Sequence, residues 1–184
     1  MPADAEREDH PVRIGLVSDT HVPKSLPRLP GALLEQLAGV DRILHAGDLV
    51  QLDVLRALER IAPTTAVSGN MDPPEVAAEL VESAVLEFGE HRVGLKHGHQ
   101  RHDLQRHYIG KAYDAPEFDL FFQTMASQLA DCELIVFGHF HAPLVKRWKD
   151  VLFINPGAIA PPHRGPTYAL LTLSDPVDVE IRAL

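Results

Sequence analysis

Seven polar side chains with metal-binding chemistry directly follow apolar, strand-like runs of this sequence. They occur in the endings SDTH, GD, GN, KHGH and GHFH, and they are Asp19, His21, Asp48, Asn70, His97, His139 and His141. Carboxylate and amide oxygens combined with imidazole nitrogens suit borderline and hard divalent ions such as Mn, Fe, Zn or Ni. The sequence therefore supplies ligands for a divalent-metal site, and the single cysteine argues against a structural zinc site made of thiolates.

Each ending also has an ordinary structural explanation when it is considered alone. Asp19 could cap a helix or form a turn, and Gly47-Asp48 and Gly69-Asn70 have the composition of turns. His97 could pack in the core. The two histidines after ELIVF have fewer structural explanations, and the occurrence of all five endings in one chain favours a shared site.

Hydrophobic patterning predicts the elements that would bring these endings together. Runs rich in Val, Ile and Leu at 12–18, 41–48 and 64–70 alternate with helical patterns at 29–39 and 51–61. This β-α-β-α-β order favours parallel strands with helical crossovers. Ligands of such sheets bind at the carboxyl ends of the strands, so we expect the endings to converge there.

The second half of the chain is mostly β. Residues 83–98 predict an antiparallel pair with a turn at Gly89–Glu90, and further short strands run from ELIVFGH to the C-terminus. We expect a disordered tail over 1–11 and one domain over 12–184 with two packed sheets. The stretch 99–131, which contains an amphipathic helix in PEFDLFFQTMASQLA, is a candidate lid or oligomer contact, or a surface excursion packed by its own aromatic residues.

Length and composition limit the class of protein. The 184 residues suit one well-buried core, and the net charge of −9 argues against stable binding to nucleic acid. No apolar run approaches the roughly 20 residues that a membrane span needs. The polar N-terminus resembles no secretory signal, and the single cysteine, Cys132, suits a reducing compartment. We expect a cytoplasmic protein with no membrane partner, and a homo-oligomer remains open.

The order D-x-H, GD, GN, HGH and GHxH resembles the calcineurin-like metallophosphoesterases. More narrowly, it resembles their small prokaryotic phosphodiesterase branch, which also contains the retromer subunit Vps29. INPGAIAPPHRG at 154–165 is similar to the NPGS loop of this branch, with Ala158 where Ser is usual. The resemblance covers roughly 12–175. It implies an α/β fold built as a four-layer α-β-β-α sandwich, with two mixed sheets flanked by helices and a two-metal site.

The resemblance also assigns the ligands. The first metal ion would be bound by Asp19, His21, Asp48 and His141, and the second by Asp48, Asn70, His97 and His139. Asp48 would bridge two divalent ions, Mn in the first instance and Ni, Fe, Co or Zn as alternatives. A hydroxide between the ions would attack the phosphorus. Two divalent ions, two carboxylates and one hydroxide sum to about +1, a charge that a phosphodiester monoanion would neutralise.

Met71 departs from the wider superfamily, in which a histidine after GN is thought to protonate the leaving group. Met71 cannot transfer a proton, and general-acid help is worth about 10²–10⁴-fold in rate. The implied enzyme should therefore favour good leaving groups such as those of aryl diesters. His99 is the nearby candidate for a catalytic proton donor, or alternatively a neighbour that orients His97.

Four further residues have predicted roles around this site. Arg101 and Arg164 could bind a phosphate oxygen of the substrate, or be solvated surface arginines. Asp72 is expected to support the turn that follows Asn70. His45 is expected to support the site and not to ligate a metal ion.

These observations predict a binuclear metal-dependent phosphodiesterase that acts on a small phosphodiester. The alternative is a Vps29-like protein-binding scaffold without significant catalysis. The complete set of seven competent ligands favours the enzyme. A nuclease of the same superfamily is disfavoured by the acidic balance of the chain.

Overall fold

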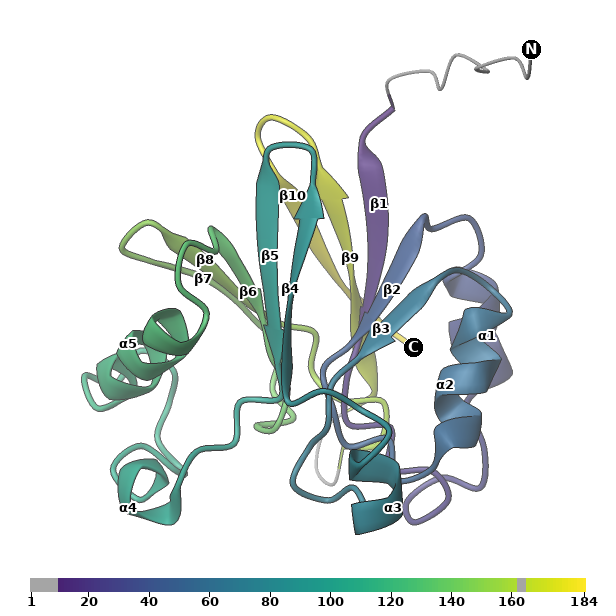
Figure 1. The fold of residues 1–184 in the computed structure, drawn as a ribbon, viewed down its shortest axis with the longest axis horizontal. Helices are drawn as coiled ribbons and strands as arrows, with labels where there is room; N and C mark the ends of the chain where they lie inside the picture. Colours follow the sequence, from purple (N-terminus) through teal and green to yellow (C-terminus); the bar gives the residue numbers. More distant parts are fainter. Residues whose placement is uncertain (1–9, 162–164) are drawn as a thin grey trace.

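Two five-stranded β-sheets pack face to face, with helices on both outer faces (Figure 1). The computed structural model describes residues 10–161 and 165–184. The predicted four-layer α-β-β-α sandwich is confirmed. No helix in these described ranges is long and apolar enough to cross a membrane.

The first sheet has the strand order β10-β9-β1-β2-β3. Its strands are β1 (Val12–Val17), β2 (Arg42–His45), β3 (Thr64–Ala66), β9 (Thr167–Leu173) and β10 (Asp178–Ala183). β1, β2 and β3 are parallel because α1 (Gly31–Gln36) and α2 (Leu52–Glu59) connect them, as the sequence predicted. β3 is shorter than the predicted strand, because Val67 forms only an isolated parallel bridge with Val81 and the loop that carries Asn70 follows it.

The second sheet has the order β4-β5-β6-β8-β7. It contains β4 (Ser83–Phe88), β5 (His91–Lys96), β6 (Leu134–Val136), β7 (Leu144–Trp148) and β8 (Val151–Asn155). β4 and β5 form the predicted antiparallel pair, while β5, β6 and β8 are parallel to one another. The short helices α3 (Pro74–Ala77) and α4 (His102–Gln105) lie in the connections near the lower ends of the sheets (Figure 1).

Three apolar clusters hold the layers together. Leu16 and Leu44 of the first sheet share a cluster with Val93 and Val136 of the second, so this cluster fills the space between the sheets. A second cluster joins the first sheet to α1 and α2, and it includes Leu33 and Leu58. This packing fixes the two sheets relative to each other, and therefore fixes the loops at their carboxyl ends.

The third cluster joins the second sheet to α5 (Phe118–Gln128). Phe118, Phe121, Phe122 and Met125 recur at helical spacing and are all buried. They pack on Phe153 and other residues of the sheet. The helical part of the 99–131 stretch is therefore a layer of the sandwich, while its role as a lid or oligomer contact stays a prediction.

Phe122→Ala tests whether α5 belongs to the core. Phe122 is completely buried, and its ring centroid lies 4.8 Å from that of Phe153. Removing the ring should lower the free energy of unfolding by about 3–5 kcal/mol in urea titrations. The exposed neighbour Gln123→Ala is the matched control. A loss below about 1 kcal/mol for Phe122→Ala would contradict this packing.

Candidate metal centre

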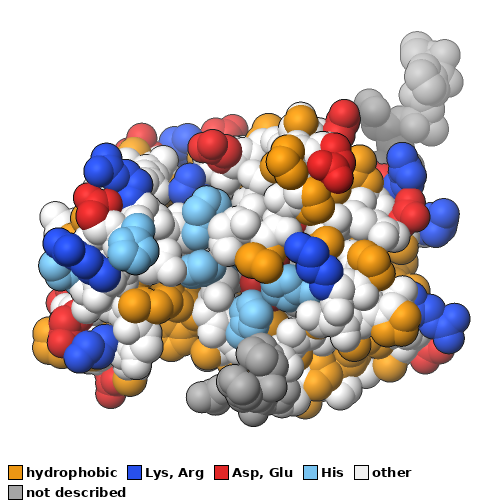
Figure 2. All heavy atoms as spheres, turned by 90° about the horizontal axis from the view of Figure 1, so that it is seen from below, with side chains coloured by type: hydrophobic (Ala, Val, Ile, Leu, Met, Phe, Trp, Pro, Cys, Tyr) orange, Lys and Arg blue, Asp and Glu red, His pale blue; other side chains and the backbone are white. Residues whose placement is uncertain are grey.

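The predicted ligands meet at one edge of the sandwich, in loops that leave both sheets. Asp19 and His21 follow β1, Asp48 follows β2, and Asn70 follows β3; from the other sheet, His97 follows β5, and His139 and His141 follow β6. Figure 2 shows this end of the molecule, with histidine side chains gathered in the middle of the face beside hydrophobic ones. Parallel strands brought the loops to the same edge, as expected.

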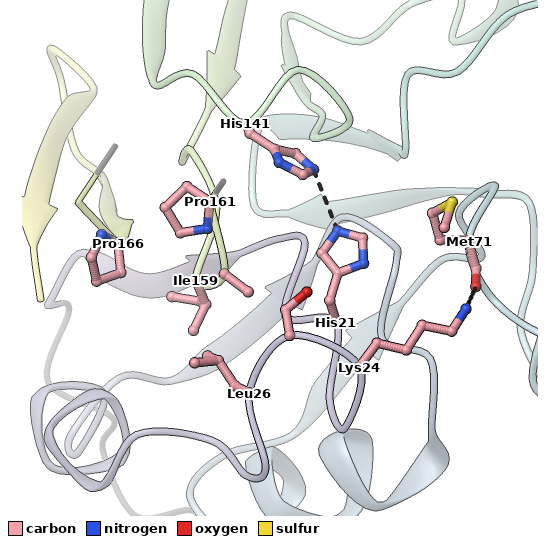
Figure 3. A pocket seen from close by; sticks show the side chains of 10 residues that line it. His21, Lys24, Leu26, Met71, His141, Ile159, Pro161 and Pro166 are labelled. Carbon is pink, nitrogen blue, oxygen red and sulfur yellow. Dashed lines mark hydrogen bonds between the residues drawn. The ribbon is translucent and has the colours of Figure 1, made fainter. Parts of the chain in front are cut away.

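One group of ligand atoms contains Asp19, His21 and His141. One atom from each lies within 4.8 Å of the other two. His141 Nε2 is 3.1 Å from Asp19 Oδ1 and 3.3 Å from His21 Nε2. The nitrogens of the two histidines point toward each other from different loops (Figure 3). Three donors at this spacing can contact a single cation.

A second group of ligand atoms contains Asp48, His97 and Asn70. His97 Nε2 is 3.3 Å from Asp48 Oδ2 and 3.1 Å from Asn70 Oδ1. The His139 ring lies beside this group, with its centroid 5.3 Å from that of His97. Asp48 Oδ2 is also 3.8 Å from His21 Nε2. The Asp48 carboxylate therefore lies between the two groups of donors.

Two buried polar atoms at the centre support the fit of a cation. Within the described residues, His139 Nε2 has no hydrogen-bond partner, and Asp19 Oδ1 has only the ion-pair contact with His141 Nε2 at 3.1 Å. Buried polar atoms are nearly always paired, because losing water without a replacement costs free energy. A divalent ion would satisfy both atoms, and the mixed oxygen and nitrogen donors suit it.

The backbone is unusual at most of these ligands. Left-handed φ angles occur at Asp19 (52°), His21 (47°), Asp48 (59°), His139 (70°) and His141 (52°). This region is uncommon for residues other than glycine and costs about 1–3 kcal/mol where the structure imposes it. Such strain concentrates at functional sites, and here it turns the side chains toward one another.

Hydrogen bonds between loops hold the backbone in this shape. Asp19 N donates to Gly47 O and His21 N donates to Asp48 O, both at 3.0 Å. His139 N donates to Asp19 Oδ2 at 3.1 Å, which ties a loop of the second sheet to a loop of the first. The centre is therefore organised by contacts across the two sheets.

Asp72 fixes the loops after β2 and β3, which confirms its predicted support of the turn. Its carboxylate accepts backbone hydrogen bonds from Val50 at 2.6 Å, Gly69 at 2.8 Å and Asp48 at 3.2 Å. Gly69 is also required, since a Cβ there would lie 2.1 Å from Asp48 Oδ1. One carboxylate thus positions both Asp48 and the turn that carries Asn70.

Neighbouring groups orient the ligands. The Nδ1–H of His97 donates to Ala46 O at 2.6 Å, which leaves Nε2 facing the centre. The carbonyl of Ala46 therefore orients this ring. His45 is buried and accepts a hydrogen bond from Gly47 N at Nδ1, so its Nε2–H faces the hydroxyl of Thr20. His45 supports the loop, as the sequence predicted.

The ionisation of the centre favours a cation. Burial alone would raise the pKa of Asp48, but its bond to His97 and the charge of that ring lower the pKa to about 2. Burial would lower the pKa of His97, but Asp48 and Asp19 raise it to about 9. Burial and the charge of His97 lower the pKa of His139 to about 4. The carboxylates are thus ionised at neutral pH and the neutral His139 offers a lone pair, while a metal ion at His97 Nε2 would displace the proton that the raised pKa keeps on this ring.

The remaining predicted site residues lie outside the two groups. The His99 ring centroid is 5.5 Å from that of His97 and 6.3 Å from that of His139, so this ring borders the centre. The side chain of Arg101 is 83% exposed and pairs with Asp103 at 3.1 Å. Arg164 lies outside the described residues. The roles proposed for these three residues stay predictions.

Sequence reasoning missed three supporting residues. Ser18 Oγ donates to Asp19 Oδ2 at 2.5 Å. Asn155 Nδ2 donates to Gly138 O at 2.9 Å, and its position before Pro-Gly at the end of a buried strand was the signal for it. Tyr113 Oη donates to Ala142 O at 3.0 Å, just after His141, and only the three-dimensional packing reveals this contact.

Residues 12–176 match the calcineurin-like phosphoesterase superfamily domain. The chain is 33% identical over 173 residues to a probable metallophosphoesterase of Methanothermobacter thermautotrophicus, covering 91% of this chain and 90% of that protein. It is 26% identical over 159 residues to a phosphodiesterase of Methanocaldococcus jannaschii, covering 79% and 83%.

Solved structures with this fold include vacuolar protein sorting 29 proteins and a phosphodiesterase. Vacuolar protein sorting 29 of Cryptosporidium parvum has a TM-score of 0.71 at 24% identity, covering 96% of this chain and 99% of that one. A novel archaeal phosphodiesterase has a TM-score of 0.70 at 24% identity, covering 94% and 99%. Vps29 of Entamoeba histolytica, complexed with Zn²⁺, has a TM-score of 0.67 at 24% identity, covering 93% and 98%. At this identity these structures show a shared fold.

Asp72→Ala tests the positioning of the centre by the Asp72 carboxylate. Three backbone amides would lose their acceptor, so Mn²⁺ affinity measured by calorimetry should fall about 10–100-fold. Asp72→Asn retains one oxygen acceptor and should give an intermediate loss. The exposed Asp103→Ala is the control. Unchanged Mn²⁺ affinity in a folded Asp72→Ala would contradict this role.

Proposed function

The chain belongs to the calcineurin-like phosphoesterase superfamily as a metal-dependent phosphoric diester hydrolase, and we propose that it works with two divalent ions bridged by Asp48. The observation that carries this proposal is the position of Asp48 Oδ2. It lies 3.8 Å from His21 Nε2 in one group of donors and 3.3 Å from His97 Nε2 in the other. A single carboxylate oxygen can therefore serve both ions.

The proposed ligands divide between two ions. The first ion would be held by Asp19, His21, His141 and Asp48, and the second by Asp48, Asn70, His97 and His139. Mn²⁺ is the proposed ion, with Ni, Fe, Co or Zn as alternatives, and Zn²⁺ is the ion in the Entamoeba relative. When bound, the ions would lower the pKa of a water that attacks phosphorus and would polarise the phosphoryl oxygens.

The charge of the ligands suits an anionic diester. Asp19 and Asp48 contribute −2, and the Asn and His ligands would be neutral once the metal ions have displaced the His97 proton, so two divalent ions leave a positive excess. A phosphodiester monoanion is attracted to this excess although the protein carries a net charge of −9. Hydrolysis adds one water and breaks one P–O bond, which yields a monoester and an alcohol or phenol.

Met71 defines the proposed preference for good leaving groups. Its backbone N–H donates to Asp48 Oδ1 at 2.8 Å, so the side chain starts beside the centre, yet it has no proton to transfer. A leaving group of low pKa departs without such help. His99, which borders His97 and His139, is the proposed proton donor for other substrates. Arg101 and Arg164 remain the proposed substrate-binding arginines.

The second candidate function is a protein-binding scaffold, and it is favoured by the Vps29 structures among the fold neighbours. The curated relatives, a probable metallophosphoesterase and a phosphodiesterase, favour the enzyme, and the complete set of donors is consistent with it. We place the enzyme in the cytoplasm, since its single cysteine, Cys132, is a free buried thiol that suits reducing conditions.

Removal and return of metal tests the dependence on divalent ions. Protein stripped with a chelator should not hydrolyse bis(p-nitrophenyl) phosphate, and Mn²⁺ should restore release of p-nitrophenolate, followed by its absorbance. Phosphate monoesters measured in parallel should be poorer substrates. Failure of Mn, Ni, Co, Fe and Zn alike to restore hydrolysis would favour the scaffold.

Asp48→Asn tests the bridge. The substitution keeps the shape of the side chain but removes the charge that serves both ions. We expect kcat/KM for bis(p-nitrophenyl) phosphate to fall by at least about a hundredfold. Asp53→Asn on the exposed face of α2 is the control and should keep the wild-type rate. A near-wild-type rate for Asp48→Asn would rule out the bridged centre.

A further inference from the structure

An apolar pocket of about 460 Å³ lies on the His21 and His141 side of the centre (Figure 3). Leu26, Met71, Ile159 and Pro161 are among the side chains that line it, and we call it the Met71 pocket. Lys24 also lines this pocket, and its Nζ donates to Met71 O at 3.4 Å. The pocket therefore combines apolar walls with one positive charge beside two candidate metal ligands.

A second pocket, of about 520 Å³, lies on the His139 and His141 side. Its walls include Ile109, Tyr113, Phe118, Phe140 and Pro143, and we call it the Ile109 pocket. Ile109, Tyr113 and Phe118 come from the 99–131 stretch, and none of the three is a proposed metal ligand. The stretch thus contributes a wall beside the centre.

The two pockets are built alike. Each contains His141, a second candidate ligand, several apolar side chains and one lysine, Lys24 or Lys111. Each also contains a large apolar side chain that is unusually exposed: Met71 is 45% exposed and Ile109 is 51% exposed. Exposed apolar side chains gathered beside a polar site are typical of surfaces that bind apolar groups.

The Ile109 pocket is held open by contacts of its own walls. Tyr113 Oη donates to Ala142 O at 3.0 Å, and Lys146 Nζ donates to Tyr113 O at 2.9 Å. The ring of Phe140 packs on those of Phe118 and Tyr113, with centroids 5.3 and 5.8 Å apart. A pocket that is already ordered costs little to organise when a ligand enters.

We propose that the Met71 pocket and the Ile109 pocket receive the two ester groups of one phosphodiester. The preferred substrates then carry a bulky, mainly apolar or aromatic group on each side of phosphorus. This rests on the proposed function, because it takes the phosphoryl group to lie at the metal centre. A diester has two substituents that leave phosphorus in different directions, and the centre has two apolar pockets that share His141. A monoester would fill only one of them.

Equilibrium binding tests the proposal without relying on turnover. Dimethyl, methyl phenyl and diphenyl phosphate are titrated by calorimetry into the metal-free protein, which should not hydrolyse them. We expect affinity to rise about tenfold for each phenyl group, the minimum gain from burying an aromatic ring. Met71→Ser and Ile109→Ser should each remove most of the affinity gained from one phenyl group. Val85 on β4 is about equally exposed but lines neither pocket, so Val85→Ser should leave both gains in affinity unchanged.

Kinetics with a constant leaving group identify which pocket holds which substituent. Phenyl p-nitrophenyl phosphate and methyl p-nitrophenyl phosphate differ only in the group that stays on phosphorus. One of the two pocket variants should lower kcat/KM for the phenyl substrate alone. The other should lower it for both substrates, because it contacts the leaving group.

The outcomes separate this proposal from the proposed function. Equal affinities for the three phosphates, or pocket variants that bind diphenyl phosphate like Val85→Ser, would overturn the two-pocket proposal. Hydrolysis without any preference for aryl groups would do the same and leave the phosphodiesterase standing. A clear aryl preference in binding, with no hydrolysis under any metal ion, would support the pockets and overturn the proposed function.

Discussion

Two buried carboxylates, Asp19 and Asp48, lie beside four histidines at the edge of the sandwich, and the rest of the site depends on keeping them ionised there. Removing a charge from water is costly unless other groups compensate it. Ser18 Oγ and the backbone N–H of His139 donate to Asp19, and the backbone N–H of Met71 donates to Asp48. The His97 and His141 rings compensate the rest of the cost, since they lie 3.3 Å from Asp48 Oδ2 and 3.1 Å from Asp19 Oδ1 and lower the pKa of both carboxyls. Divalent cations would take over this role when they displace protons from the rings.

Packing of the two sheets stabilises this arrangement of carboxylates and histidines. The apolar cluster between the sheets holds β1 and β2 against β5 and β6, so the loops of both sheets converge at one edge. Left-handed backbone at five ligands is sustained by this framework and by the Asp72 carboxylate. On the other side, Phe140 lies between the two histidines of the HFH loop and packs on the aromatic rings of α5 and its neighbours. The outer layer therefore supports metal ligands as well as covering the sheet.

The order of strands and helices, and the polar residues at the strand ends, could be predicted from hydrophobic patterns in the sequence. Parallel strands joined by α1 and α2 must end at the same edge, so Asp19, Asp48 and Asn70 could be placed together from their positions after apolar runs. The hydrogen bonds that hold the ligand loops could not be predicted in the same way, because they join residues that are distant in the sequence. The three backbone amides that donate to Asp72 belong to two different loops. The hydrogen bond from Tyr113 to Ala142 likewise joins segments that are far apart in the sequence. The Arg101 side chain pairs with the carboxylate of Asp103, which would compete with a substrate phosphate for this arginine. A sequence motif does not reveal such a pairing.

Anomalous diffraction from a crystal soaked in Mn²⁺ can show whether two ions share the Asp48 carboxylate. We expect two anomalous peaks about 3.5–4 Å apart, both in contact with Asp48. One peak should also contact Asp19, His21 and His141, and the other Asn70, His97 and His139. A single peak at full Mn²⁺ occupancy, or two peaks that Asp48 does not join, would exclude the shared carboxylate.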